Sequence, residues 1–138
     1  MEYKKLFLKE ITDREVGEGS FVEFYLNEKN NEINIEPRLG MIVLPGGGYD
    51  FCSQREAEPI ALRYMSEGFN CFVLHYTCKT SYPLPYEEVA ALFEFIQNHT
   101  DELNVSKNNI SVIGFSAGGH LASSYGFVYK EFEEKFKQ

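Results

Sequence analysis

The residues best suited to chemistry lie in a short segment at 114–118, which has the pattern Gly-x-Ser-x-Gly. A mostly apolar run at 110–113 precedes this segment, and residues typical of helices follow it. A serine at a sharp strand-to-helix turn has a strained backbone, and glycines two residues away on either side remove clashes with the neighbouring chain. Free backbone N–H groups and the dipole at the start of the helix favour a developing negative charge. The pattern therefore predicts that Ser116 is a nucleophile.

A second glycine-rich segment at 46–48 follows a short apolar run at 41–45 and precedes a helical pattern. Glycines there let backbone N–H groups point into a cavity, which suits a phosphate or an oxyanion. The phosphate interpretation is weak, because neither a Gly-x-Gly-x-x-Gly spacing nor a Lys-Ser/Thr ending is present. We therefore expect an oxyanion hole made by the N–H of Ala117 and an N–H of Gly47 or Gly48.

With two further segments, these stretches resemble the α/β-hydrolase esterases of the acetyl xylan esterase and hormone-sensitive-lipase-like type. The resemblance rests on residues 44–49, 55–61, 73–76 and 114–122 and covers most of the chain from about residue 36 onward. It implies a serine esterase that hydrolyses short-chain acyl esters, with acetylated carbohydrates among the substrates. The usual His-Gly-Gly-Gly of this group reads Pro-Gly-Gly-Gly at 45–48, a variant associated with the acetyl xylan esterase-like branch.

Enzymes of this type use a triad whose order along the chain is Ser, then Asp or Glu, then His. Only 22 residues follow Ser116, and they include one histidine, His120, and three glutamates. We therefore interpret residues 1–138 as a single, incomplete domain, the N-terminal half of a larger hydrolase. The general base and its carboxylate are expected outside these residues, so this chain alone is expected to be inactive.

The three histidines do not have the position expected of a triad base. His120 lies one helical turn after Ser116, where packing and hydrogen bonding are favoured over a role as base, although the base remains the alternative. His75 lies in a strand near the edge that carries the site and is expected to pack. His99 ends a helix and is expected to be exposed to solvent.

From residue 40 onward, apolar strands alternate with helices, which predicts a parallel sheet covered on both faces. Upstream, two stretches alternate apolar and polar residues, which predicts antiparallel strands with one wet face. We expect an α/β fold: the N-terminal half of an α/β hydrolase, with a mostly parallel sheet, helices on both faces and an antiparallel N-terminal strand pair. The expected strands are 3–10, 20–28, 41–45, 70–76 and 110–114, the helices about 54–67, 86–99 and 117–129, and a turn occupies 106–109.

The connecting segments carry further expectations. Residues 27–38 are polar and are expected to form a loop with a short extended piece at 33–35. Gly68 is expected to end the first helix in a left-handed conformation. The loop at 77–85 follows a parallel strand at the edge where open α/β sheets bind ligands. Its Tyr82, Pro83 and Pro85, with Tyr86, either line an acyl or leaving-group pocket or stiffen the loop. Cys78 has no basic neighbour there and is interpreted as an unreactive thiol.

Composition narrows the classes of partner. The hydrophobic content of 43% and the charged content of 25% are those of a globular protein, and no apolar run could span a bilayer. The net charge of −8 argues against nucleic acid and against an anionic membrane surface, because phosphates are bound through Lys and Arg. Three cysteines without zinc spacing and a start without a signal-peptide core predict a cytoplasmic protein with no metal. No cofactor is expected, and the partner is a small-molecule ester.

An incomplete sheet has a consequence for assembly. In α/β hydrolases the strand before the nucleophile lies within the sheet, so strand 110–114 would be left as an apolar edge. We therefore expect a fragment of a longer protein, or a homodimer that pairs through 110–114. The alternative function is a non-catalytic α/β module that binds or pairs and has an inactive hydrolase cleft.

Overall fold

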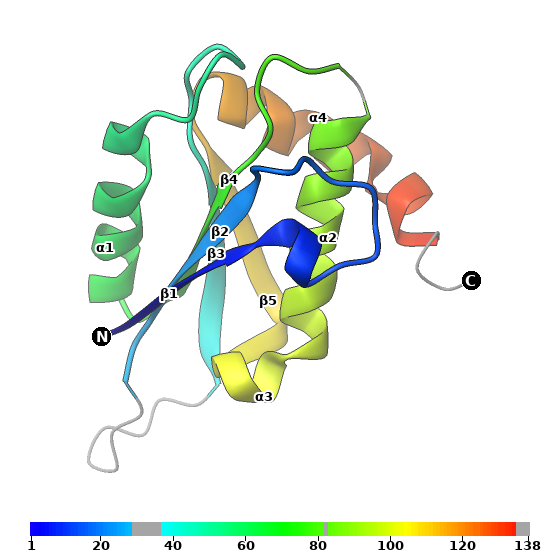
Figure 1. The fold of residues 1–138 in the computed structure, drawn as a ribbon. Coiled ribbons are helices and arrows are strands. Elements are labelled where there is room, and N and C mark those ends of the chain that lie inside the picture. Colours follow the sequence, from blue (N-terminus) through cyan, green and yellow to red (C-terminus); the bar gives the residue numbers. More distant parts are fainter. Residues whose placement is uncertain (29–36, 82, 135–138) are drawn as a thin grey trace.

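The computed structural model describes residues 1–28, 37–81 and 83–134, and the side chains of these residues up to 130. Five strands form one sheet in the order β1-β2-β4-β3-β5 (Figure 1). The strands are β1 (Glu2–Phe7), β2 (Phe21–Leu26), β3 (Arg38–Leu44), β4 (Asn70–His75) and β5 (Val105–Gly114). The helices are α1 (Glu58–Ser66), α2 (Leu84–Asn98), α3 (Thr100–Leu103) and α4 (Ala117–Glu134), and 3-10 turns occupy Leu8–Glu10 and Gln54–Glu56.

The sheet combines an antiparallel and a parallel part, as the sequence predicts. β1 pairs with β2 and β2 pairs with β4 in antiparallel fashion, whereas β3 pairs in parallel with both β4 and β5. The carboxyl ends of β3, β4 and β5 therefore lie at one edge of the sheet. The glycine segment, the residues after β4 and Ser116 all follow these ends.

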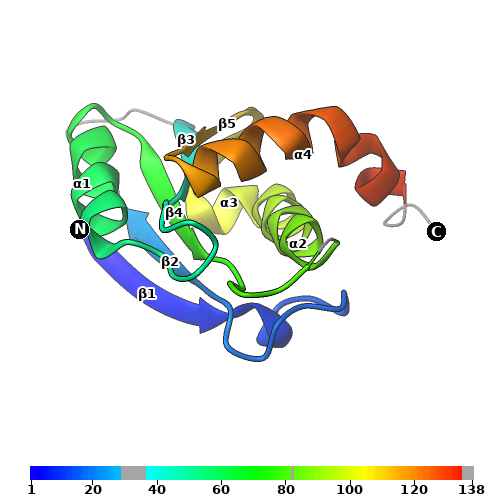
Figure 2. The ribbon, with the colours of Figure 1, turned by 90° about the horizontal axis from the view of Figure 1, so that it is seen from above.

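Helices cover both faces of the sheet. α1 lies on one face, and α2, α3 and α4 lie on the other, as the view from above shows (Figure 2). Alternate side chains of the central strands divide between two apolar clusters, because successive residues of a strand point to opposite faces. The larger cluster lies under α2 and α4 and includes Phe24, Ile42, Leu44, Phe72, Leu92, Ile96 and Leu121. The smaller one lies under α1 and includes Met41, Val43, Val73, Ala61 and Met65.

Several element boundaries differ from the sequence expectation. The turn expected at 106–109 is wrong: β5 already begins at the buried Val105, which lies opposite Arg38, and the pairing then shifts register before Gly40. The helix expected at 54–67 is a 3-10 turn followed by α1, with a proline in the first turn of α1. Gly68 has a φ of 99°, which confirms the left-handed helix end. The extended piece expected at 33–35 lies outside the described residues.

β5 lies at an edge of the sheet and pairs with β3 alone among the described strands. Pairing of its 110–114 segment with a second copy stays a prediction. Within the described part of the chain, no helix is long and apolar enough to cross a membrane.

The segment after β4 is fixed by a buried carboxylate of α2. Glu88 is fully buried and accepts hydrogen bonds from the backbone N–H of Thr77 at 2.7 Å, from the Thr77 hydroxyl at 2.6 Å and from the N–H of Gly17 at 3.0 Å. Charged acceptors form the stronger hydrogen bonds of proteins, so this carboxylate holds two loops against α2.

We expect Glu88→Ala to lower the free energy of unfolding by roughly 2–4 kcal/mol, because it leaves buried N–H groups without an acceptor. Denaturant unfolding measures this. Glu102→Ala, at an exposed position of α3, is the control and should change the free energy of unfolding by about 0.5 kcal/mol or less. Equal effects of the two substitutions would contradict the anchoring role of Glu88.

Candidate active site

Ser116 lies between the end of β5 and the start of α4. β5 ends at Gly114, α4 begins at Ala117, and Ser116 itself is exposed and has a φ of 53°. Its carbonyl oxygen accepts the N–H of His120 at 2.9 Å, which starts the helical hydrogen bonding. Such a left-handed conformation is costly for a residue other than glycine. This is the strained strand–turn–helix geometry that the sequence predicts.

The glycines of the 114–118 motif are required by a close contact between α4 and β3. A Cβ atom on Gly118 would lie 2.0 Å from the carbonyl oxygen of Leu44, and one on Gly114 would lie 2.2 Å from the carbonyl oxygen of Gly118. The same Leu44 oxygen accepts the N–H of Phe115 at 3.2 Å. Backbone therefore meets backbone here, and no side chain fits between them.

The glycine loop, residues 45–53, brings the second predicted segment to Ser116. A Cβ atom on Gly46 would lie 3.2 Å from the Cβ of Ser116, so the two residues are in contact. The N–H of Gly46 donates to Oε1 of Glu56 at 3.1 Å and is thereby occupied. The N–H groups of Gly47 and Gly48 donate no backbone hydrogen bond within the described residues. Sequence reasoning assigned no role to Glu56, although it lies within the 55–61 segment that carries the family resemblance.

Hydrogen bonds from Tyr76 and Lys79, and one within the loop, hold the glycine loop in place. The Tyr76 hydroxyl donates to the carbonyl oxygen of Pro45, and burial raises the pKa of Tyr76, so this hydroxyl keeps its proton. The N–H of Ser53 donates to the carbonyl oxygen of Gly46 at 2.8 Å, which closes the loop on itself. The N–H of Lys79 donates to the carbonyl oxygen of Tyr49 at 2.6 Å.

His120 contacts the glycine loop. Its Nδ1 forms a hydrogen bond of 2.6 Å with the Tyr49 hydroxyl, and its Nε2 lies 3.4 Å from the Ser124 hydroxyl. The rings of Tyr49 and His120 also meet edge to face, with centroids 5.8 Å apart. The hydrogen-bonded role favoured by the sequence fits this arrangement, although His120 is exposed and is not packed in the interior.

The other two histidines have partners elsewhere. His75 ends β4, stacks on Phe21 with ring centroids 4.2 Å apart, and donates from Nε2 to Glu23 at 2.5 Å. His99 is partly buried, donates from Nδ1 to the carbonyl oxygen of Phe95 at 2.7 Å and stacks on the Phe95 ring, so the expectation of a solvent-exposed His99 is wrong. Among the described residues, which include all three histidines, the Ser116 hydroxyl forms no hydrogen bond with a histidine ring.

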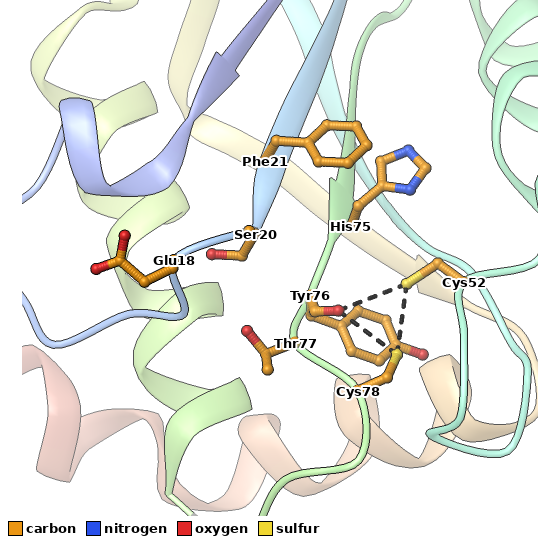
Figure 3. A pocket seen from close by; sticks show the side chains of 9 residues that line it. Glu18, Ser20, Phe21, Cys52, His75, Tyr76, Thr77 and Cys78 are labelled. Carbon is orange, nitrogen blue, oxygen red and sulfur yellow. Dashed lines mark hydrogen bonds between the residues drawn. The ribbon is translucent and has the colours of Figure 1, made fainter.

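A cavity of about 380 Å³ opens at the same edge of the sheet, and Figure 3 shows it from close by. Its lining comes from the start of β2, the glycine loop and the end of β4: Glu18, Gly19, Ser20, Phe21, Cys52, His75, Tyr76, Thr77 and Cys78. Of the residues considered for an acyl pocket or a stiffened loop, Pro85 and Tyr86 belong to α2 and Tyr82 lies outside the described residues, so both interpretations stay predictions. No group of three or more potential metal ligands occurs among the residues described.

We expect Gly118→Ala to lower the free energy of unfolding by roughly 2–3 kcal/mol, because the added methyl group overlaps the Leu44 carbonyl. Gly126→Ala in the same helix is the matched control, since a Cβ there has no neighbour within 4 Å. That substitution should raise the free energy of unfolding by about 0.5–1 kcal/mol, the usual gain of alanine over glycine in a helix. Chemical denaturation of both variants checks the contact, and a neutral Gly118→Ala would refute it.

The pair of His75 and Glu23 predicts a loss of stability in acid. Burial lowers the pKa of His75 despite the neighbouring carboxylate. Burial alone would raise the pKa of Glu23, but hydrogen bonds from Tyr3 and His75 outweigh it and lower that pKa. As the pH falls, the unfolded chain therefore takes up protons at a higher pH than the folded chain does. This difference begins near about pH 6.5 for the histidine and near about pH 4.3 for the carboxylate.

We accordingly expect the free energy of unfolding to fall as the pH drops below about 6.5, by up to about 1.4 kcal/mol for each unit by which the histidine pKa is lowered. Urea titrations between pH 7.5 and 5 measure the slope. His75→Gln should flatten it in this range, and parallel slopes for the two proteins would show that His75 does not cause it.

Comparison with known proteins places the chain in a family. The family model described as BD-FAE matches residues 23–138, which is most of the chain. The endo-1,4-beta-xylanase B of Butyrivibrio fibrisolvens is 33% identical over 99 residues, covering 68% of this chain and 16% of the relative. An acetylxylan esterase of Xylanibacter ruminicola is 29% identical over 85 residues, covering 60% of this chain and 18% of the relative.

The fold is also that of a solved hydrolase. The α/β hydrolase MGS-M1, from a Medee basin deep-sea metagenome library, is 37% identical and superposes with a TM-score of 0.82. The match covers 91% of this chain and 50% of MGS-M1, so the chain spans about half the length of this structure and less of the two curated relatives. The chain belongs to the BD-FAE family of esterase-like α/β hydrolases.

Proposed function

We propose that Ser116 is the nucleophile of an ester hydrolase and that the N–H groups of Ala117 and of Gly47 or Gly48 form its oxyanion hole. The observation that carries this proposal is the contact between Ser116, at a φ of 53°, and Gly46 of the glycine loop. Two segments about 70 residues apart thereby meet at an exposed serine, and the N–H groups of Gly47 and Gly48 donate no backbone hydrogen bond within the described residues. The N–H of Ala117 lies at the first position of α4, where no intrahelical acceptor exists.

The proposed reaction has two halves. The Ser116 oxygen attacks the ester carbonyl carbon and its proton passes to a general base, while the carbonyl oxygen becomes an anion held by the N–H of Ala117 and that of Gly47 or Gly48. The C–O bond to the alcohol then breaks, and the base returns the proton to the alcohol. Water attacks the resulting acyl-serine by the same route, which releases the carboxylic acid and restores the serine.

We propose that the base and its orienting carboxylate come from outside these 138 residues. The placement of the histidines supports this, since His75 and His99 are bound to Glu23 and Phe95, and His120 is bound to Tyr49. In a serine hydrolase, loss of the serine or the histidine costs about 10⁶ in kcat. Residues 1–138 alone should therefore hydrolyse esters very slowly.

Short-chain acyl esters, including acetylated carbohydrates, are the proposed substrates. The support is the similarity to the acetylxylan esterase of Xylanibacter ruminicola and to the endo-1,4-beta-xylanase B of Butyrivibrio fibrisolvens. A cytoplasmic location is proposed with it, on the ground that an odd number of cysteines, three, does not indicate the disulfide framework of a secreted protein.

The second candidate is a non-catalytic module that binds a ligand or pairs with another chain at an inactive cleft. The engagement of His120 by Tyr49 favours it, because this histidine is the one nearest to Ser116 in sequence and it contacts the glycine loop instead. Chemical rescue separates the two candidates, since a small base can enter a site whose own base is missing.

We expect added imidazole to raise the hydrolysis of p-nitrophenyl acetate by the folded chain roughly tenfold over Ser116→Ala under the same conditions, by acting as a diffusible general base. Without imidazole the two proteins should be equal. Ser123→Ala, an exposed serine of the same helix, is the matched control and should behave like the unsubstituted chain.

An imidazole-dependent rate that is unchanged in Ser116→Ala would refute Ser116 as nucleophile and favour the binding module. Ser116-dependent turnover without imidazole would instead refute the external base. His120→Ala would then test whether His120 serves in its place.

A further inference from the structure

Two thiols meet between the loops that follow β3 and β4. Sγ of Cys52, in the glycine loop, lies 3.9 Å from Sγ of Cys78, in the β4 loop, defined here as residues 76–81 (Figure 3). Both thiols point to the carbonyl oxygen of Tyr76, at 3.7 Å and 3.5 Å. The two cysteines are 26 positions apart in the chain, so the fold alone brings them together.

We propose that Cys52 and Cys78 form a reversible intramolecular disulfide that joins the glycine loop to the β4 loop. The sulfurs of a disulfide are about 2.05 Å apart, so each side chain has to move its sulfur by roughly 1 Å. Rotation about the bonds of the two side chains supplies a movement of this size without a change of fold.

The two loops are already held next to each other. The N–H of Lys79, the residue after Cys78, donates to the carbonyl oxygen of Tyr49 in the glycine loop at 2.6 Å. The N–H of Ser53, the residue after Cys52, donates to Gly46 at 2.8 Å. Neighbouring backbone on both sides is thus fixed, and the second thiol attacks at a high effective concentration.

Both thiols are accessible to a small reagent, whereas the third cysteine is not. Cys52 and Cys78 are partly exposed and line the cavity of about 380 Å³ at the edge of the sheet. Cys71 is fully buried in β4, among the side chains under α1. Cys71 therefore serves as an internal control for the accessibility of a thiol to the reagent.

The oxidant is a low-molecular-weight disulfide such as oxidised glutathione. One protein thiolate attacks a sulfur of the reagent, forms a mixed disulfide and releases one small thiol. The second protein thiolate then attacks the protein sulfur of that mixed disulfide and releases the second small thiol. The protein loses two electrons and two protons, and one reagent disulfide is reduced to two thiols.

The rate is expected to depend on pH. Burial raises the pKa of Cys52 to about 12 and also raises the pKa of Cys78, so few thiolates exist at neutral pH. The low reactivity that the sequence suggests for Cys78 as an isolated thiol agrees with this. The bond is favoured by the proximity of the two thiols and not by a lowered thiol pKa. Because the thiolate is the reacting form, the rate of disulfide formation should rise roughly tenfold per pH unit between pH 7 and 9.

The test is oxidation of the folded chain with oxidised glutathione, followed by intact mass, and then by alkylation in denaturant and peptide mapping. We expect a monomeric product lighter by two hydrogen atoms, a peptide that links Cys52 to Cys78, and Cys71 as the alkylated thiol. A product in which both cysteines keep glutathione, or in which Cys71 is linked, would overturn the proposal.

Single substitutions supply the controls. Cys52→Ser and Cys78→Ser should each stop at a mixed disulfide with glutathione, whereas Cys71→Ser should form the same internal bond as the unsubstituted chain. The oxidised chain should melt roughly 5 °C or more above the reduced chain, as expected for a bond that closes a loop of this length. Equal or lower melting would show that the loops do not accommodate the bond, and would overturn the proposal. The disulfide does not depend on the proposed esterase function, so either can fail without the other.

Discussion

The site depends on one backbone contact, in which the first turn of α4 packs directly on the carbonyl end of β3. Leu44 lies opposite Gly114 in the parallel pairing, and its carbonyl oxygen also accepts the N–H of Phe115. The chain then reverses into α4, whose Gly118 would place a Cβ only 2.0 Å from that oxygen. Ser116 is strained because the chain has to reverse at this residue. The well-packed sheet beneath it holds the residue in that conformation.

Two carboxylates fix the loops around this contact. Glu56 accepts the N–H of Gly46, and the buried Glu88 accepts the N–H of Thr77. Loop N–H groups near a sheet edge need an acceptor, and a charged one from a neighbouring element supplies a stronger bond than a turn within the loop. Because Glu56 occupies the N–H of Gly46, it leaves Gly47 and Gly48 as the donors of this segment. Glu56 thus determines which glycine N–H groups of this loop are left without that acceptor.

The sequence predicts well what depends on local pattern. The alternating strands and helices, the antiparallel N-terminal pair and the left-handed Gly68 follow from periodicity and residue type, and all are present. The start of β5 at Val105 was missed, because the polar residues 106–109 have the composition of a turn. Among the described residues they have no partner on β3, and the pairing runs from Val105, opposite Arg38, to Ile110, opposite Gly40. The partners of Glu56 and of Cys52 were missed for a different reason. They are set by where loops meet in space, which no spacing in the sequence encodes.

The same geometry supports the proposal that a base for Ser116 comes from outside these residues. On α4 a side chain leans toward the N-terminal turn of the helix, and His120 does so until it meets Tyr49 of the glycine loop. Its bond therefore steadies the loop that carries Gly47 and Gly48. On the other side of Ser116, β5 pairs with β3 alone among the described strands and leaves its second edge free to bind. A parallel strand that paired with this edge would end close to Ser116, so in the proposed reaction the element that covers the apolar strand would also be placed to supply the base.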